Sequence, residues 1–148
     1  MLKGCQVSGL MFWSISLTLC LWLMPVPKIV RRGEMLFQGK EKINARIRGQ
    51  EDLLPLMAVR CINCHRAENQ ARLSRVAAPQ LNRSLLLDVR GRRGGPPSRY
   101  DEPAFCRLLR TGADSAYILI AREMPVYEVN DAQCTSLWTF LVEQENVQ

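Results

Sequence analysis

Residues 61–65 read Cys61-Ile62-Asn63-Cys64-His65, a Cys-x-x-Cys-His run that occurs once in this chain of 148 residues. Cysteines three residues apart lie on the same face of a helical turn, so both thiols are expected to project to one side. His65 follows directly and is the single histidine of the chain. Two thiols and an imidazole on one turn predict a site that holds a metal or a metal-bearing cofactor.

The same spacing is the one by which a c-type haem is attached to protein. The thiols of Cys61 and Cys64 would form thioethers with the two vinyl groups along one edge of the porphyrin. His65 would then lie beneath the iron, where its imidazole is a strong axial ligand. We therefore expect one covalently bound haem c.

Other interpretations of the motif remain open. A redox Cys-x-x-Cys usually follows a strand in a βα unit, and the sequence shows no such strand. A zinc site would combine Cys61, Cys64 and His65 with a distant Cys106 or Cys134. Zinc sites usually bring their ligands as two closely spaced pairs, however, and Cys106 and Cys134 are each solitary. A structural disulfide between Cys61 and Cys64 is favoured least.

The sixth ligand of a haem iron must come from a residue other than histidine, because the chain has only one. Methionine is the usual alternative, and it favours the reduced iron. Met124 is the best candidate, since it precedes Pro125, which limits the backbone of both residues and stiffens the loop. Met35 is the second candidate, whereas Met57 is too close to Cys61 to reach the opposite face of a haem.

Three segments have helical patterns. The first surrounds residues 54–67 and carries the cysteine motif. The second begins with the cap-type residues Asp101-Glu102-Pro103 and ends at Gly112. The third is the clearest: Asn130 and Gln133 form a capping pair, and an apolar stripe runs through Cys134, Leu137, Trp138, Leu141 and Val142. We expect no long strand.

Taken together, Cys61-x-x-Cys64-His65, the later Met124-Pro125 and the terminal helix resemble the class I cytochrome c family. The resemblance covers about residues 36–141. It implies a mainly α fold, a small helical domain wrapped around one covalent haem. Residues 78–81, Ala-Pro-Gln-Leu, are similar to the family's Gly-Pro-x-Leu segment. There a proline carbonyl accepts the second imidazole N–H, so the resemblance implies that Pro79 supports His65.

The function implied is electron transfer by one haem with His65 and Met124 on its iron, in a carrier that is not itself an enzyme. Its partners would be redox proteins: a dehydrogenase, a quinol-oxidising complex or a terminal oxidase. It would serve as a free carrier or as the haem subunit of such an enzyme. Two alternatives remain, namely a zinc-binding interaction domain and a small haem sensor or enzyme in which Met124 is displaceable.

The resemblance also gives a role to Cys106 and Cys134. Haem attachment of this type takes place outside the cytoplasm, and an oxidising compartment permits disulfides. Both cysteines lie on expected helices and can face inward. We expect them to form a disulfide, against the alternative of two buried free thiols.

The N-terminal residues 1–27 are expected to act as a signal anchor or signal peptide. Lys3 is the only charged side chain before Lys28, and residues 4–27 reach the roughly 20 residues that cross a bilayer as a helix. Because no small-residue cleavage site ends the segment, we favour an uncleaved anchor in the inner membrane, with the domain in the bacterial periplasm. Lys28, Arg31 and Arg32 oppose this orientation, since such charges usually remain cytoplasmic. Residues 28–50 are expected to be a linker or an N-terminal extension, and residues 51–148 the cytochrome c domain.

The charge distribution argues against a nucleic-acid partner. The formal net charge is +6, of which Lys3 in the leader supplies one. The densest basic run, between Arg90 and Arg99, is interleaved with glycine and proline, whereas nucleic-acid surfaces combine a basic stripe with aromatic residues. We read this run as a solvated loop.

Overall fold

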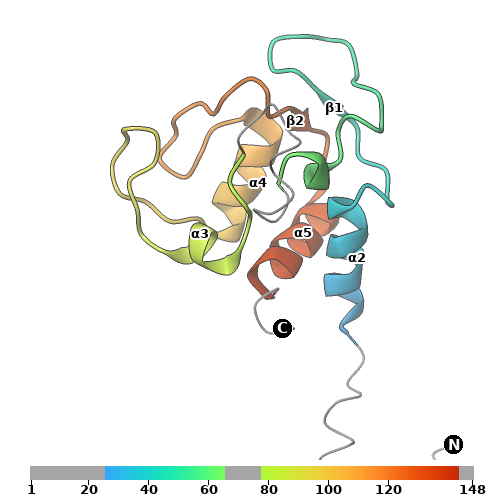
Figure 1. Ribbon diagram of the computed structural model, residues 1–148, viewed down its shortest axis with the longest axis horizontal. Helices are drawn as coiled ribbons and strands as arrows, with labels where there is room; N and C mark the ends of the chain where they lie inside the picture. The colour runs from blue at the N-terminus through green and yellow to red at the C-terminus, as the bar shows by residue number, and fades with distance from the viewer. Residues whose placement is uncertain (1–25, 66–77, 144–148) are drawn as a thin grey trace, which may run out of the picture.

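The computed structural model describes residues 26–65 and 78–143. Four α-helices, a short 3₁₀ turn and two very short strands follow one another along the described chain (Figure 1). They are α2 (Lys28–Phe37), β1 (Ala45–Arg46), η1 (Cys61–Asn63), α3 (Arg83–Leu87), α4 (Glu102–Thr111), β2 (Val126–Tyr127) and α5 (Asp131–Glu143). The leader expected over residues 1–27 lies almost entirely outside the described residues. Within them no helix has the length and apolar character needed to span a membrane.

The first and last described helices, α2 and α5, pack against each other (Figure 1). Helix α2 buries Val30, Gly33, Leu36 and Phe37, which recur at helical spacing and therefore share one face. Gly33 makes the contact close. A Cβ atom at this position would lie 2.0 Å from the carbonyl oxygen of Ser136 in α5. Any side chain larger than hydrogen at residue 33 would therefore push the two helices apart.

The segment 28–50, expected to be a linker or an N-terminal extension, packs with the rest of the described chain. Helix α2 contributes to the same core as the later helices, and β1 lies within this segment as well. The domain therefore begins at about Lys28 and not at residue 51. The apolar stripe of α2 was obscured in the sequence by Lys28, Arg31 and Arg32, which resemble the charged flank of the leader.

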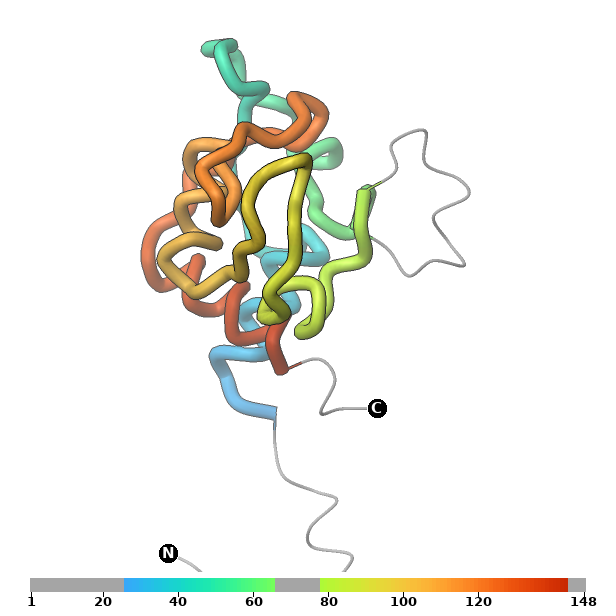
Figure 2. Tube along the Cα trace, turned by 90° about the vertical axis from the view of Figure 1, so that its left-hand side faces the viewer, coloured from blue at the N-terminus to red at the C-terminus, as the bar shows by residue number. Residues whose placement is uncertain are grey.

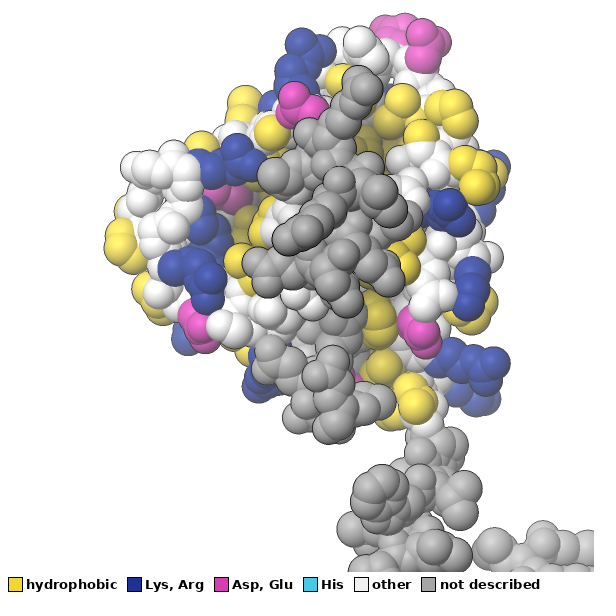
Figure 3. All heavy atoms as spheres, in the orientation of Figure 1, with side chains coloured by type: hydrophobic (Ala, Val, Ile, Leu, Met, Phe, Trp, Pro, Cys, Tyr) yellow, Lys and Arg dark blue, Asp and Glu magenta, His cyan; other side chains and the backbone are white. Residues whose placement is uncertain are grey.

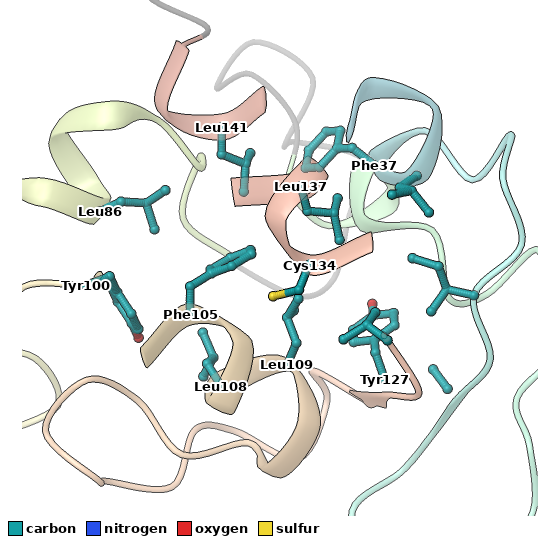
Figure 4. Packing of buried hydrophobic residues seen from close by; sticks show 14 of the residues in the cluster. Phe37, Leu86, Tyr100, Phe105, Leu108, Leu109, Tyr127, Cys134, Leu137 and Leu141 are labelled. Carbon is teal, nitrogen blue, oxygen red and sulfur yellow. The ribbon is translucent and has the colours of Figure 1, made fainter. Parts of the chain in front are cut away.

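The core lies between α2, α4 and α5 (Figure 4). Both later helices have the ends that the sequence predicts. Asp101 accepts a hydrogen bond from the backbone N–H of Ala104 at 2.8 Å, and α4 ends at Gly112 with φ +74°. At α5 the Gln133 N–H donates to the Asn130 side chain at 2.9 Å, and the Asn130 N–H donates to the Gln133 side chain at 3.1 Å. This reciprocal pair is a complete capping box.

A two-stranded antiparallel ribbon lies at the opposite end of α4 from α3 (Figure 1). Ala45 pairs with Tyr127, and Arg46 pairs with Val126. Each strand has two residues, too short to give the period-two pattern by which strands are found in a sequence. The ribbon nevertheless joins the segment before the cysteine motif to the segment that carries Met124.

The basic run between Arg90 and Tyr100 forms a narrow hairpin (Figure 2). Arg90 and Ser98 exchange backbone hydrogen bonds of 3.1 and 3.0 Å. The guanidinium of Arg92 donates to the backbone carbonyl of Leu85 at 2.7 Å and lies over the ring of Tyr100, 5.0 Å from its centre. Arg92 thus closes the hairpin against α3. The run is a loop, as expected, but one of its arginines has a structural role.

The substitution Gly33→Ala should destabilise the protein by about 2 kcal/mol, because overpacking at a helix contact outweighs the better helix propensity of alanine. Chemical denaturation of the purified protein measures the free energy of unfolding. Gly91→Ala is the matched control, since the nearest atom to an added Cβ there is 3.8 Å away. The control should stay within about 0.5 kcal/mol of the unchanged protein. Equal effects of the two substitutions would contradict the close contact.

Candidate functional site

The cysteine motif forms a single backbone turn. The N–H groups of Cys64 and His65 both donate to the carbonyl of Cys61, at 3.2 and 3.0 Å. The predicted helix over residues 54–67 is reduced, within the described residues, to the 3₁₀ turn Cys61–Asn63. Leu54 donates its N–H to the carbonyl of Ala45 at 2.8 Å, and Pro55 disfavours helical geometry in the residue before it. The turn still places the two thiols and the imidazole within one short stretch of backbone.

Pro79 holds the imidazole of His65. The Nδ1 atom of His65 lies 2.7 Å from the carbonyl oxygen of Pro79. A carbonyl oxygen only accepts, so Nδ1 carries the proton and donates it. In the neutral ring Nε2 then has the free lone pair, which is the form that binds a metal. Burial lowers the pKa of His65 and favours this neutral form, although the hydrogen bond to Pro79 opposes the shift.

The two cysteines of the motif are free and half-buried. Burial raises the pKa of the Cys61 thiol to about 11, and a hydrogen bond with the hydroxyl of Tyr127 reduces this rise. The Cys61 side chain is therefore a neutral thiol near pH 7, placed against the core.

Tyr127 is a member of the site that the sequence analysis did not identify. Its hydroxyl donates a buried hydrogen bond of 3.0 Å to the carbonyl of Val59 and lies near the side chain of Cys61. Burial raises the pKa of Tyr127, and the neighbouring Cys61 raises it further. A tyrosine far along the chain gives no sequence signal for this contact, because the contact depends on the pairing of β1 with β2.

Met124, the proposed sixth ligand, lies three residues before Tyr127. Three residues of extended chain span at most about 11 Å, so Met124 is kept in the neighbourhood of the Cys61 turn. Its side chain is half-buried and packs against the core. Met35, the alternative ligand, lies on α2 with 37% of its surface exposed.

Cys106 and Cys134 are joined by a disulfide that links α4 to α5. This is the pair favoured in the sequence analysis. Cys134 is fully buried, and its helix carries Trp138, whose ring lies 5.6 Å from that of Phe105 in α4. In this state neither cysteine has a thiol to offer as a fourth zinc ligand. No group of three or more His, Cys, Asp or Glu side chains in residues 26–65 and 78–143 is arranged to hold a metal ion.

On the face shown in Figure 3, the Lys and Arg side chains are spread over several places around the edge and do not form one patch. Among the described residues, four arginines pair with nearby carboxylates: Arg32 with Glu41, Arg46 with Glu128, Arg90 with Asp88 and Arg110 with Asp131. Part of the positive charge is thus compensated locally.

Comparisons with protein-family models, with curated proteins and with solved structures found no match to this chain. The assignment of function therefore depends on the residues and geometry of the site itself.

Alkylation of Cys61 by iodoacetamide in the haem-free protein should keep rising with pH up to about 11, because burial raises the pKa of this thiol to about 11. In the unfolded chain the same reaction should level off above about pH 8.5. At pH 8 the thiolate fraction of Cys61 should be lower in the folded protein by roughly two orders of magnitude. Pulsed labelling with peptide mass spectrometry measures both profiles. A folded-state profile that levels off near pH 9 would contradict the buried environment.

Proposed function

We propose that this protein is a monohaem c-type cytochrome that carries single electrons. Cys61 and Cys64 hold the haem covalently, His65 is one iron ligand and Met124 is the other. The observation that carries the proposal is the turn at residues 61–65. It presents two free thiols beside an imidazole whose Nδ1 is already engaged by Pro79 at 2.7 Å.

The residues present fit such a group. The two cysteines of the motif remain thiols while the other two described cysteines are paired with each other. The Pro79 carbonyl fixes the ring orientation of His65 and leaves Nε2 as the nitrogen free to bind iron, as second-shell carbonyls do for ligating histidines. Soft sulfur and imidazole nitrogen are the donors that suit haem iron. A haem, when bound, supplies iron that cycles between the ferric and ferrous states.

The protein's own residues would hold and insulate that iron. His65 and Met124 would both hold the iron, so no ligand position would be left for a substrate. This set of ligands supports electron transfer without bond chemistry, in a carrier or in the haem subunit of a dehydrogenase or oxidase complex. Several half-buried apolar side chains from the motif and from segments before and after it pack against the core, and they would exclude water from a bound ring: Leu54, Ile62, Leu81 and Met124.

The proposed location follows from the chemistry of attachment and from the sequence of the leader. Haem attachment of this type and a disulfide between Cys106 and Cys134 both suit an oxidising compartment. With residues 4–27 as an uncleaved anchor, the domain would lie on the periplasmic side of the bacterial inner membrane. There it would exchange electrons with a dehydrogenase, a quinol-oxidising complex or a terminal oxidase.

The protein exported in a host with a c-type haem maturation system should retain haem through denaturing electrophoresis. Peroxidase staining of the gel and intact-mass measurement should both show one haem per chain. The control C61S/C64S should carry none, because it lacks both thioether-forming thiols. A colourless wild-type protein that contains one zinc ion would favour the zinc-binding alternative and refute the proposal.

The substitution Met124→Ala should abolish the weak long-wavelength absorption band of the sulfur–iron bond. It should also lower the reduction potential by on the order of 0.1 V, within the roughly 0.8 V over which axial ligands set haem potentials. Absorption spectroscopy and a redox titration of the holoprotein measure these changes. Met35→Ala is the matched control and should alter neither quantity. The reverse pattern would assign the ligand to Met35, and an unchanged spectrum in Met124→Ala would exclude Met124.

A further inference from the structure

The hydroxyl of Tyr127 connects two segments that are far apart in the sequence. It donates to the Val59 carbonyl at 3.0 Å in a buried environment, close to the side chain of Cys61. Within residues 26–65 and 78–143, the Val59 carbonyl accepts from no backbone N–H group outside the helices and strands. Since a buried carbonyl without a donor is unfavourable, this single hydroxyl satisfies a group that the fold has removed from water.

The backbone around Tyr127 is fixed on both sides. Tyr127 pairs with Ala45 across the ribbon, and the next residue, Glu128, donates its N–H to the carbonyl of Asn44 at 2.9 Å. The carbonyl of Ala45 in turn accepts the N–H of Leu54 at 2.8 Å, on the chain leading to Val59. The side chain of Tyr127 is 8% exposed. Its hydroxyl is therefore the buried end of a rigid connection between residues 124–127 and residues 59–61.

We propose that Tyr127 is a positioning residue that holds the Met124 segment against the Cys61 turn and so keeps the Met124 sulfur on the iron. This inference rests on the proposed function and deepens it, because it names the residue that positions the sixth ligand of the iron. Pro125 limits the backbone between Met124 and the ribbon, so a displacement at residue 127 is transmitted to Met124. A phenylalanine in this place would fill the same space but would leave the Val59 carbonyl without its donor.

The test uses the full-length holoprotein with Tyr127→Phe, compared with Tyr117→Phe as the matched control. Tyr117 is 73% exposed, and its hydroxyl accepts from Arg107 at 3.3 Å, away from the contact with Val59. Each protein is titrated with free imidazole, which displaces a weakly held methionine from ferric iron. The long-wavelength band and the reduction potential are recorded in parallel.

Tyr127→Phe should keep its covalent haem but bind imidazole about five to ten times more tightly, the fold-change expected from the loss of one buried hydrogen bond. Its sulfur–iron band should weaken and its potential should fall. Tyr117→Phe should match the wild type in all three measurements. Wild-type values in Tyr127→Phe would overturn the inference while leaving the proposed function intact. Absence of covalent haem from the wild-type chain would overturn both.

A second variant separates the hydroxyl from the ring. 3-Fluorotyrosine at position 127 keeps a donor of at least equal strength, so imidazole affinity should be equal to or lower than that of the wild type. If this variant binds imidazole as tightly as Tyr127→Phe, the hydroxyl has no positioning role. If Tyr127→Phe does not assemble with haem, the test depends on the fluorotyrosine protein. An imidazole affinity above the wild-type value in that protein overturns the inference.

Discussion

The contact between Gly33 and Ser136 is the constraint on which the rest of the domain depends. Because a hydrogen atom occupies the place of a side chain, α2 approaches the backbone of α5 and buries Leu36 and Phe37 beside it. Helix α5 is in turn tied to α4 by the Cys106–Cys134 disulfide. The three helices therefore form one framework, against which the cysteine turn and the ribbon are placed.

The sequence predicted those features that depend on residues close together in the chain. The capping box at Asn130, the cap at Asp101 and the left-handed Gly112 are local rules, and each is found in the structure. The spacing of the Cys61 turn is local as well.

Most of the features that were missed depend on distant residues or are very short. Helix α2 has a local apolar stripe but was expected to be part of a linker or extension, and β1 and β2 are too short to show a periodic pattern. Tyr127 could not be assigned to the site without the pairing of these strands, because nothing in its own neighbourhood points to Val59 or Cys61. Pro79 was reached through a family resemblance, since the spacing of residues alone does not place its carbonyl beside His65.

The structure also shows where Lys28, Arg31 and Arg32, which follow the expected leader, lie. They lie on the solvent-facing side of a folded helix, where Arg32 pairs with Glu41 at 2.8 Å.

The packing of the first described helix against the last also determines when the fold can be completed during synthesis. The apolar face of α2 can pack against α5 only after α5 has been synthesised, and α5 is the last element of the described chain. The residues of the Cys61 turn leave the ribosome well before that moment, since chains are built from the N-terminus. Until then, the helical framework against which the Cys61 turn is placed is incomplete. The thiol of Cys61 is therefore more accessible in the growing chain than in the finished fold, where it packs against the core.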